Sequence, residues 1–323
     1  MIYDDIKNFN KQFEYEPRVE NSAKLKKFSK FVVVGMGGSH LSADILKAWK
    51  PNLDIIVWNN YGLPPLKESE LKERLIITSS YSGNTEETID ACNEAKKRHL
   101  AIAVIAAGGK LIRLAQKFKV PYVQMPDMHF QPRVALGLTL KAILALMSER
   151  TALREASELS ATLRPSREEH SGRDLARRLH GSVPIIYASL RNAAIAKIWK
   201  IKFNETGKIP AFCNFLPELN HNEMTGFDVK SKTMHLSKNF QFVFLKDGED
   251  DRRIIKRMNV LERLYHDRGF KVEVLLLSDK SRLRKIFSSL ILADWTAYYT
   301  AKLYEVEPEQ VPMVEEFKKL IGR

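Results

Sequence analysis

The chain has 323 residues, of which 44% are hydrophobic and 28% charged, a balance typical of globular domains and not of fibrous or low-complexity chains. Its net charge of +13 is spread over short, scattered basic clusters, which favours small phosphorylated ligands over nucleic acid. The two cysteines exclude a disulfide framework and show no zinc-ligand spacing, and no apolar run reaches the roughly 18 residues of a membrane helix.

The amino terminus, Met1–Asp5, has neither a basic nor an apolar segment of the kind that begins a secretory signal. We therefore expect a cytoplasmic protein that acts without a metal, a nucleic acid or a membrane. The length suits two domains of roughly 150 residues each.

In the first half of the chain, short runs rich in Val and Ile alternate with longer amphipathic stretches. The expected strands are 31–35, 53–58, 75–79, 100–106 and 120–125, and the expected helices are 42–49, 86–98 and 110–118. Apolar strands separated by helices indicate a parallel sheet that is covered on both faces. One long helix, or two, is expected over 133–163, with a shared apolar face made by Leu136, Leu140, Ile143, Leu144 and Met147.

The polar stretch 164–169 contains Pro165 and is a plausible break, after which the alternation resumes. The expected strands here are 183–189, 240–245 and 272–277, and the expected helices are 192–203, 250–267, 281–304 and 311–320. A series that ends and restarts predicts an α/β protein with two similar domains, residues 1–150 and 151–323. Each domain is expected to be a parallel sheet flanked by helices on both faces.

A glycine-rich turn, Gly35-Met36-Gly37-Gly38-Ser39-His40, follows the first expected strand. Glycines allow a sharp turn and a close approach to a ligand, and the next helix would direct free N–H groups at an anion. The turn lacks the third glycine of a dinucleotide site and the Gly-Lys-Ser/Thr of a nucleotide P-loop. A tight turn with no ligand explains it equally well, so both interpretations stay open.

A second turn, Ser79-Ser80-Tyr81-Ser82-Gly83-Asn84-Thr85-Glu86-Glu87-Thr88, also lies between an expected strand and an expected helix. The hydroxyl groups of Ser80, Ser82 and Thr85 can donate to a phosphate, together with backbone amides of the helix. The alternative is a capping box formed by Asn84 and Glu87, which needs no ligand. The hydroxyl groups outnumber what a cap requires, so we favour a phosphate site.

The two turns, GMGGS and SYSGNTEET, resemble the sugar isomerase (SIS) domain. Three further stretches, 131–133 (QPR), 202–208 (KFNETGK) and 216–223 (LPELNHNE), resemble the bifunctional phosphoglucose/phosphomannose isomerase family. The similarity covers essentially the whole chain, in the family's order. It implies two SIS domains, a homodimer, and interconversion of glucose 6-phosphate and fructose 6-phosphate, often with mannose 6-phosphate, without a metal or an organic cofactor.

The resemblance also implies roles for individual residues. Those expected to touch the substrate are Gly37, Gly38 and Ser39 beside the sugar, and Ser80, Ser82 and Thr85 at the phosphate. Arg133 would stabilise an enediolate, and Glu205 would move a proton between C1 and C2. His221, reaching the site from the neighbouring subunit, would assist ring opening, and Lys318 would act on the ring oxygen.

These residue types suit aldose–ketose exchange. One carboxylate can take a proton from one carbon and return it to the next, and such a base works best when desolvation raises its pKa toward neutrality. A fixed cation stabilises the developing oxyanion, and a histidine can move the proton that ring opening requires. Without the resemblance, Glu205 would be read as a surface residue, His221 as a helix cap and Lys318 as a residue that favours the helix dipole.

The sequence departs from the family at two places. The usual Glu-Asn-Ala-Lys reads 205–208 Glu-Thr-Gly-Lys, and Val311 stands where members can carry a polar residue associated with the C2 epimer, so mannose 6-phosphate activity is left open. Two other functions fit parts of the sequence. A SIS-type sensor would bind a sugar phosphate without chemistry. A nicotinamide dehydrogenase rests on GMGGS alone and lacks the expected ribose-binding acid, because Asn59 and Asn60 follow the second strand.

Overall fold

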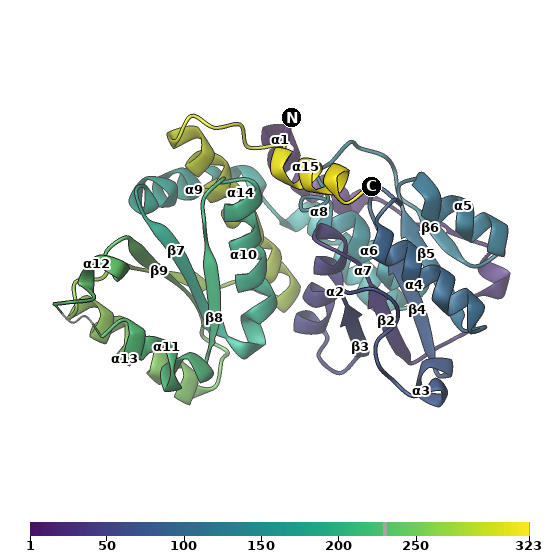
Figure 1. Cartoon of the computed structure of the whole chain (residues 1–323), viewed down its shortest axis with the longest axis horizontal. Helices are drawn as coiled ribbons and strands as arrows, with labels where there is room; N and C mark the ends of the chain where they lie inside the picture. The colour runs from purple at the N-terminus through teal and green to yellow at the C-terminus, as the bar shows by residue number, and fades with distance from the viewer. Residues whose placement is uncertain (229–230, 323) are drawn as a thin grey trace. The chain divides into compact units, whose positions relative to one another are not determined.

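The computed structural model describes residues 1–228 and 231–322 and divides into two compact units. The N-terminal unit comprises Ile2–Leu163 with Met313–Arg323, and the C-terminal unit comprises Arg164–Pro312 with Met1. Each is a sheet with helices on its faces (Figure 1). In the part of the chain that the structure describes, no helix has the length and apolar character needed to cross a membrane.

The N-terminal unit contains a six-stranded sheet in the order β1-β6-β5-β4-β2-β3. Its strands are β1 (Val19–Glu20), β2 (Lys30–Val34), β3 (Asp54–Trp58), β4 (Arg74–Ser79), β5 (Ala101–Ala106) and β6 (Tyr122–Gln124). All neighbours are parallel except β1, which pairs antiparallel with β6. The five expected strands are therefore confirmed, whereas β1, with two residues, gives no periodic signal.

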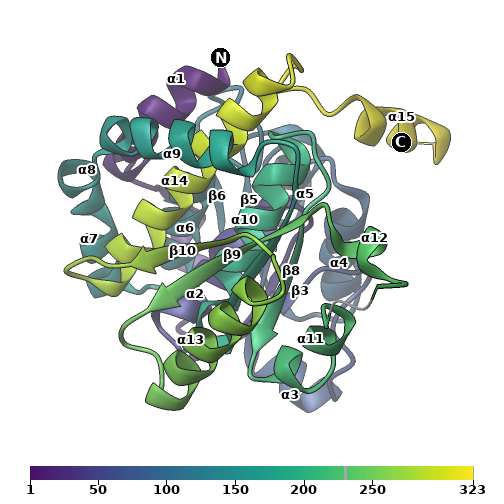
Figure 2. The same ribbon diagram turned by 90° about the vertical axis from the view of Figure 1, so that its left-hand side faces the viewer.

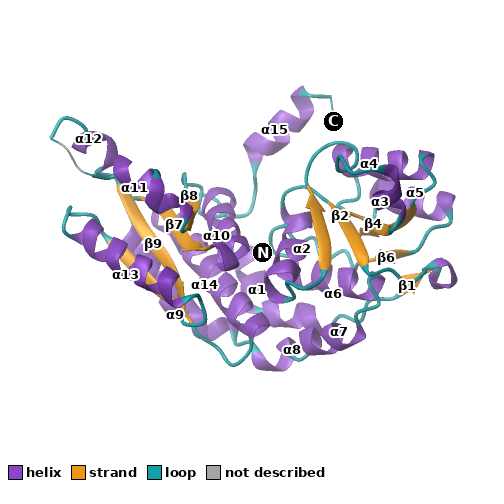
Figure 3. Ribbon diagram, turned by 90° about the horizontal axis from the view of Figure 1, so that it is seen from below, coloured by secondary structure: helices purple, strands orange, loops and turns teal. Residues whose placement is uncertain are grey.

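Helices cover both faces of this sheet (Figure 3). They are α1 (Ile2–Lys7), α2 (Gly38–Trp49), α3 (Glu68–Lys72), α4 (Glu86–Lys97), α5 (Gly109–Phe118), α6 (Leu136–Leu146), α7 (Arg150–Ser157) and α8 (Leu159–Thr162), with 3₁₀ turns η1 (Phe9–Glu14) and η2 (Ser22–Lys24). The strand and helix types follow the apolar pattern, because the buried positions of α4 recur at helical spacing and those of β4 are continuous.

The stretch expected to be one or two helices over 133–163 forms three, α6, α7 and α8. Ser148 lies between the first two with a φ of 59°, a left-handed conformation that ends a helix. The expected apolar face, from Leu136 to Met147, is buried, and α6 is buried on nearly all its other sides as well. Even Lys141 is fully buried, with its ammonium donating to the carbonyl of Phe13 at 2.7 Å.

The C-terminal unit contains a four-stranded parallel sheet in the order β10-β9-β7-β8 (Figure 2). Its strands are β7 (Val183–Ser189), β8 (Phe212–Leu216), β9 (Phe240–Asp247) and β10 (Val272–Leu277). Its helices are α9 (Pro165–Leu179), α10 (Ala193–Glu205), α11 (Glu223–Gly226), α12 (Met234–Ser237), α13 (Arg252–His266) and α14 (Arg282–Leu303), with η3 (Leu190–Asn192) and η4 (Glu218–His221). The expected α/β class, with two parallel-sheet domains, is confirmed.

The predicted break at 164–169 falls at the division between the two units, Leu163 and Arg164, but it is shorter than expected, because α8 ends at Thr162 and Pro165 already begins α9. Proline is well tolerated in the first helical turn, where its missing N–H group would have no partner in any case. Gly172 lets α9 approach α14 closely, since a Cβ atom at this position would lie 2.4 Å from the Cβ of Trp295. The last helix, α15 (Pro312–Leu320), forms where 311–320 was expected and has no buried residue.

Candidate active site

The two glycine- and serine-rich turns meet at one edge of the N-terminal sheet. They follow β2 and β4, which are adjacent and parallel, so both strands end at the same edge. The chain continues from β2 to β3 on one side of this strand pair and from β4 to β5 on the other side. The strand order therefore reverses between β2 and β4, and α/β sheets commonly bind ligands at such a switch point. Ser39 joins the turns, because its hydroxyl accepts from the Tyr81 amide at 3.0 Å and its carbonyl accepts from the Ser79 hydroxyl at 3.1 Å.

The second turn collects hydroxyl groups at the start of α4. The hydroxyls of Ser80 and Thr85 lie 2.8 Å apart, and those of Ser80 and Ser82 accept from the amides of Gly83 and Asn84 at 3.1 and 3.2 Å. Gly83 has a φ of 69°, and a Cβ atom there would lie 1.9 Å from the carbonyl oxygen of Gly108. Only glycine fits this position, so the shape of the hydroxyl-lined turn depends on it.

The capping box expected from Asn84 and Glu87 does not form. The N-cap of α4 is Thr85, and its side chain makes no cap hydrogen bond. The side chain of Asn84 instead accepts from the amide of Lys110 at 3.0 Å, at the start of α5. The close packing of 82–84 on 108–109 directs Asn84 toward the neighbouring helix. The capping box, which was the explanation of this turn without a ligand, is therefore absent from the structure.

Arg133 lies against the glycine turn. A Cβ atom on Gly38 would lie 2.4 Å from the carbonyl carbon of Pro132 and 2.6 Å from the amide nitrogen of Arg133, so the two backbones are in direct contact. The Arg133 residue is only 1% exposed, and its guanidinium donates to the side chain of Gln131 at 3.1 Å. Arg133 is thus a buried cation whose backbone lies against the glycine turn, one of the two turns that the sequence predicts to bind an anionic substrate.

Tyr81 is a site residue to which the sequence assigned no role. Its hydroxyl accepts from the amides of Met128 and Phe130 at 3.2 and 3.3 Å, and burial raises its pKa. The segment that Tyr81 holds, residues 126–130, continues directly to Arg133. Pro126, Met128 and Phe130 of this segment also line a cavity of about 570 Å³. Tyr81 thereby connects the hydroxyl-lined turn to the segment that carries the arginine. A large aromatic residue between two turn serines was the only sequence signal for this role.

The proposed base lies in the C-terminal unit. Glu205 is the last residue of α10 and is half-buried. Its carbonyl accepts from the ammonium of Lys208 at 2.6 Å, and the same ammonium bonds the carbonyl of Gln310. One turn earlier, the fully buried Lys202 forms an ion pair with Asp294 at 2.5 Å, which joins α10 to α14. The helix end that carries Glu205 is therefore firmly placed within its unit.

The two other predicted residues are exposed. His221 ends η4 in the C-terminal unit, and its side chain faces solvent within the chain. Lys318 lies in α15, is 42% exposed and pairs with Glu315 at 2.7 Å. The residues expected to touch the substrate lie with Arg133 in the N-terminal unit, and Glu205 and His221 lie in the C-terminal unit. That all of these residues form one site stays a prediction.

The corresponding edge of the C-terminal sheet is occupied by its own charges. Asp247, at the end of β9, is fully buried and accepts from Lys285 at 2.7 Å, from Arg282 at 2.9 Å and from Arg191 at 3.3 Å. Burial alone would raise the pKa of Asp247, but Lys285 and its other donors hold it below its usual value. We call this network the Asp247 cluster. Because Lys285, Arg282 and Arg191 already donate to the carboxylate of Asp247, a bound anion would have to compete with this carboxylate for their N–H groups.

No metal centre is apparent among residues 1–228 and 231–322, since no group of three or more His, Cys, Asp or Glu residues is arranged to hold an ion. The donors at the edge of the N-terminal sheet are hydroxyls, amides and a guanidinium, and these bind anions.

Comparisons with known proteins agree on one family. The model of the bacterial phospho-glucose isomerase C-terminal SIS domain matches residues 168–321. A bifunctional phosphoglucose/phosphomannose isomerase of Aquifex aeolicus is 30% identical over 98% of this chain and 97% of its own length. The enzyme of the same name from Caldicellulosiruptor bescii is 31% identical over 99% of this chain and 98% of its own.

A solved structure of a glucosamine-6-phosphate deaminase from Thermotoga maritima shares the fold, with a TM-score of 0.67, 16% identity and 96% of each chain covered. Identity at that level supports the fold alone. The similarity to the two isomerases covers nearly the whole chain and therefore both units. The chain therefore belongs to the bifunctional phosphoglucose/phosphomannose isomerase family.

Proposed function

We propose that this protein is an aldose–ketose isomerase that interconverts glucose 6-phosphate and fructose 6-phosphate. Activity on mannose 6-phosphate stays open because of Val311 and is decided by the assay below. The observation that carries the proposal is the meeting of the hydroxyl-lined turn, the glycine turn and the buried Arg133 at one sheet edge, in a member of this family. In this proposal the enzyme acts as a cytoplasmic homodimer whose subunits share their active sites, and it needs neither a metal nor a nicotinamide.

The substrate's phosphate is held by Ser80, Ser82 and Thr85 together with the amino terminus of α4. A phosphate bound there receives several short hydrogen bonds, and hydroxyl donors suffice for a monophosphate. The glycine turn at 37–39 leaves room for the sugar to lie along the backbone. This arrangement fixes one end of the molecule, so that C1 and C2 can be presented to catalytic groups.

Catalysis then follows from the remaining groups. His221 and Lys318 move the protons that open the ring, and Glu205 takes a proton from C2 of the aldose and returns it to C1. The negative charge that develops on the enediolate oxygen is stabilised by Arg133, which is already buried and so needs no reorganisation when the charge forms. A base contributes about 10²–10⁴-fold to the rate, and a fixed cation at the oxyanion contributes as much or more.

The direct test is turnover of purified protein. With fructose 6-phosphate in metal-free buffer without a nicotinamide, we expect glucose 6-phosphate to accumulate, and a coupled assay with each hexose 6-phosphate in turn gives the specificity. Mannose 6-phosphate tests the effect of Val311. If sugar phosphates bind but none is turned over, the protein is a sugar-phosphate sensor and the isomerase proposal is wrong.

The phosphate role of the second turn has its own test. Replacing Ser80 and Ser82 together with alanine should raise KM for fructose 6-phosphate at least about tenfold, because hydrogen bonds to a charged group contribute about 1.5–3 kcal/mol each. Ser160→Ala, which removes a hydroxyl bonded to the carbonyl of Ser157 in the same unit, is the control and should keep a normal KM. An unchanged KM in the double variant would mean that the turn does not bind phosphate.

A further inference from the structure

The segment that carries His221 is made of two very short elements. η4 and α11 have four residues each, and helices of this length are not stable by themselves. The segment must therefore be attached to the rest of the unit by particular side chains. The side chain of His221 itself is exposed.

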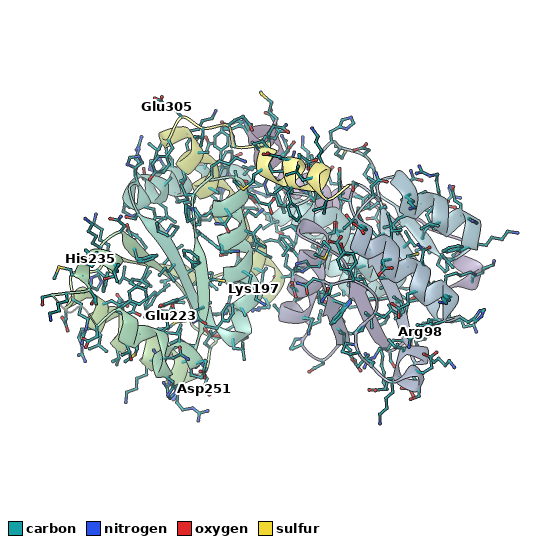
Figure 4. All side chains as sticks on the ribbon, viewed as in Figure 1. Arg98, Lys197, Glu223, His235, Asp251 and Glu305 are labelled. Carbon is teal, nitrogen blue, oxygen red and sulfur yellow. The ribbon has the colours of Figure 1, made fainter. Side chains whose placement is uncertain are left out.

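Two attachments flank the histidine. Leu219, two positions before it, is fully buried in the core cluster of the C-terminal sheet. Glu223, two positions after it, is the polar attachment and begins α11 beside the end of β8, where Figure 4 labels it. The family resemblance drew attention to this stretch of sequence without giving Glu223 a role.

The carboxylate of Glu223 bridges two strands. One oxygen accepts from the hydroxyl of Tyr187 at 2.5 Å, and the other accepts from the side-chain amide of Asn214. Tyr187 on β7 and Asn214 on β8 are direct partners in the register of the sheet, so both donors project from the same place. The amide of Asn214 is itself oriented, because its oxygen accepts from the backbone amide of Phe215 at 2.8 Å.

Tyr187 is a rigid donor. It is fully buried, and its ring lies 5.3 Å from that of Phe242 and 5.5 Å from that of Phe244, measured between centroids. Burial raises the pKa of Tyr187 well above its ordinary value, and the neighbouring Tyr265 and Glu223 add to this. The hydroxyl therefore keeps its proton and continues to donate throughout the neutral range.

Met224 and Phe227 add apolar contacts, because both pack against the same core cluster of the C-terminal sheet. Further polar contacts lie on the exposed side of the segment. The side chain of Asn222 accepts from the amide of Glu223 at 2.6 Å and donates to the exposed Glu218 at 2.8 Å. These bonds join neighbours within the segment and do not reach the sheet. The carboxylate of Glu223 thus supplies hydrogen bonds from the carboxyl side of the histidine to β7 and β8, beside the apolar contacts of Met224 and Phe227.

We propose that Glu223 is a positioning residue for His221, fixing the place of the imidazole through its bonds to Tyr187 and Asn214. The inference rests on the proposed function, in which His221 acts in ring opening. A group that transfers a proton must be held within about 0.5 Å of its productive position, and a displacement of about 1 Å can cost about 10²-fold in rate. Loss of the attachment should thus slow ring opening without weakening phosphate binding.

The test uses Glu223→Gln, Tyr187→Phe and the matched control Tyr265→Phe in the full chain. Glutamine keeps the shape of the side chain but presents an N–H₂ group where two acceptors are needed. We expect kcat for cyclic hexose 6-phosphates to fall about 10–100-fold in Glu223→Gln and less in Tyr187→Phe, with KM changed by less than about threefold. Tyr265→Phe removes a hydroxyl from the same cluster that touches Tyr187 only at 3.4 Å, and should leave kcat near normal.

Two further measurements separate this role from a merely structural one. Affinity for an acyclic aldonic acid phosphate, which needs no ring opening, should be unchanged in Glu223→Gln. Amide hydrogen exchange over 218–226 should be at least about tenfold faster in this variant, whether or not the protein is catalytic. If Glu223→Gln does not fold, Tyr187→Phe carries the test, because phenylalanine fits the aromatic cluster.

The possible results are distinct. An active wild type with kcat in Glu223→Gln within twofold of normal overturns the positioning role and leaves the isomerase proposal intact. An inactive wild type overturns the isomerase proposal, and hydrogen exchange then decides on the attachment alone. Unchanged exchange in the variant overturns the attachment, and faster exchange supports it.

Discussion

Replacing Glu205 with glutamine is expected to lower kcat for fructose 6-phosphate by at least about 10²-fold while substrate binding survives. Glutamine preserves the size of the side chain but cannot accept the proton that moves between C1 and C2. KM should change little, since the phosphate and the sugar are held by groups of the two turns. Initial rates at saturating substrate, with equilibrium binding of fructose 6-phosphate, provide the measurement.

Glu262→Gln is the matched control for this experiment. Glu262 is a partly buried glutamate on α13 of the same unit and has no proposed role at the site. Its replacement changes the net charge by the same amount as Glu205→Gln and should leave kcat unaffected. Turnover of Glu205→Gln within about threefold of normal would remove Glu205 as the base and would leave another carboxylate to be found.

The second large effect is expected from Gly38→Ala. The new methyl group would lie 2.4 Å from the carbonyl carbon of Pro132 and 2.6 Å from the amide nitrogen of Arg133. These are backbone atoms, which cannot move aside as a flexible side chain can, so the segment carrying Arg133 must shift. Overpacking of this kind costs about 1–3 kcal/mol of stability, and displacement of the oxyanion cation should lower kcat/KM by at least about 10²-fold.

Gly62→Ala separates the loss of activity from a general loss of stability. Gly62 lies in the same unit with a φ of 62°, and a Cβ atom there would lie 2.7 Å from a carboxylate oxygen of Glu94, the far end of a flexible side chain. This variant should be less stable to thermal unfolding but should keep its kcat/KM. If Gly38→Ala is as active as Gly62→Ala, the contact between the glycine turn and Arg133 is not important for the reaction.

The fold was largely predictable because its strands are continuous apolar runs and its helices alternate with them. Among the elements missed, α9 and β8 have weak patterns for identifiable reasons. α9 is mostly polar, and its buried stripe consists of a few residues that face α14. β8 is short, only its last residue is buried, and it contains Asn214, a residue depleted in strands. Both elements depend on partners distant in the sequence.

The candidate site likewise has parts that the sequence predicts and parts that it does not. The hydroxyl-lined turn was predicted because three donors within six residues are a local signal. The hydrogen-bond partners of Tyr81 and Asn84 could not be predicted, since they lie 47 and 26 positions further along the chain. The bond between Glu223 and Tyr187, which are 36 positions apart, is equally invisible to a pattern. A local pattern indicates which chemistry a turn offers, whereas the contacts that hold the turn in place depend on the folded chain.

The Asp247 cluster has a consequence for stoichiometry. Two folds of one kind in a chain suggest binding sites for two molecules of a metabolite. The C-terminal fold, however, already fills its own switch-point edge with an aspartate, in the place where a phosphate would compete for Lys285 and Arg282. Under the proposed function, one polypeptide would therefore take up one sugar phosphate, at its N-terminal fold, and the C-terminal fold would contribute catalytic side chains.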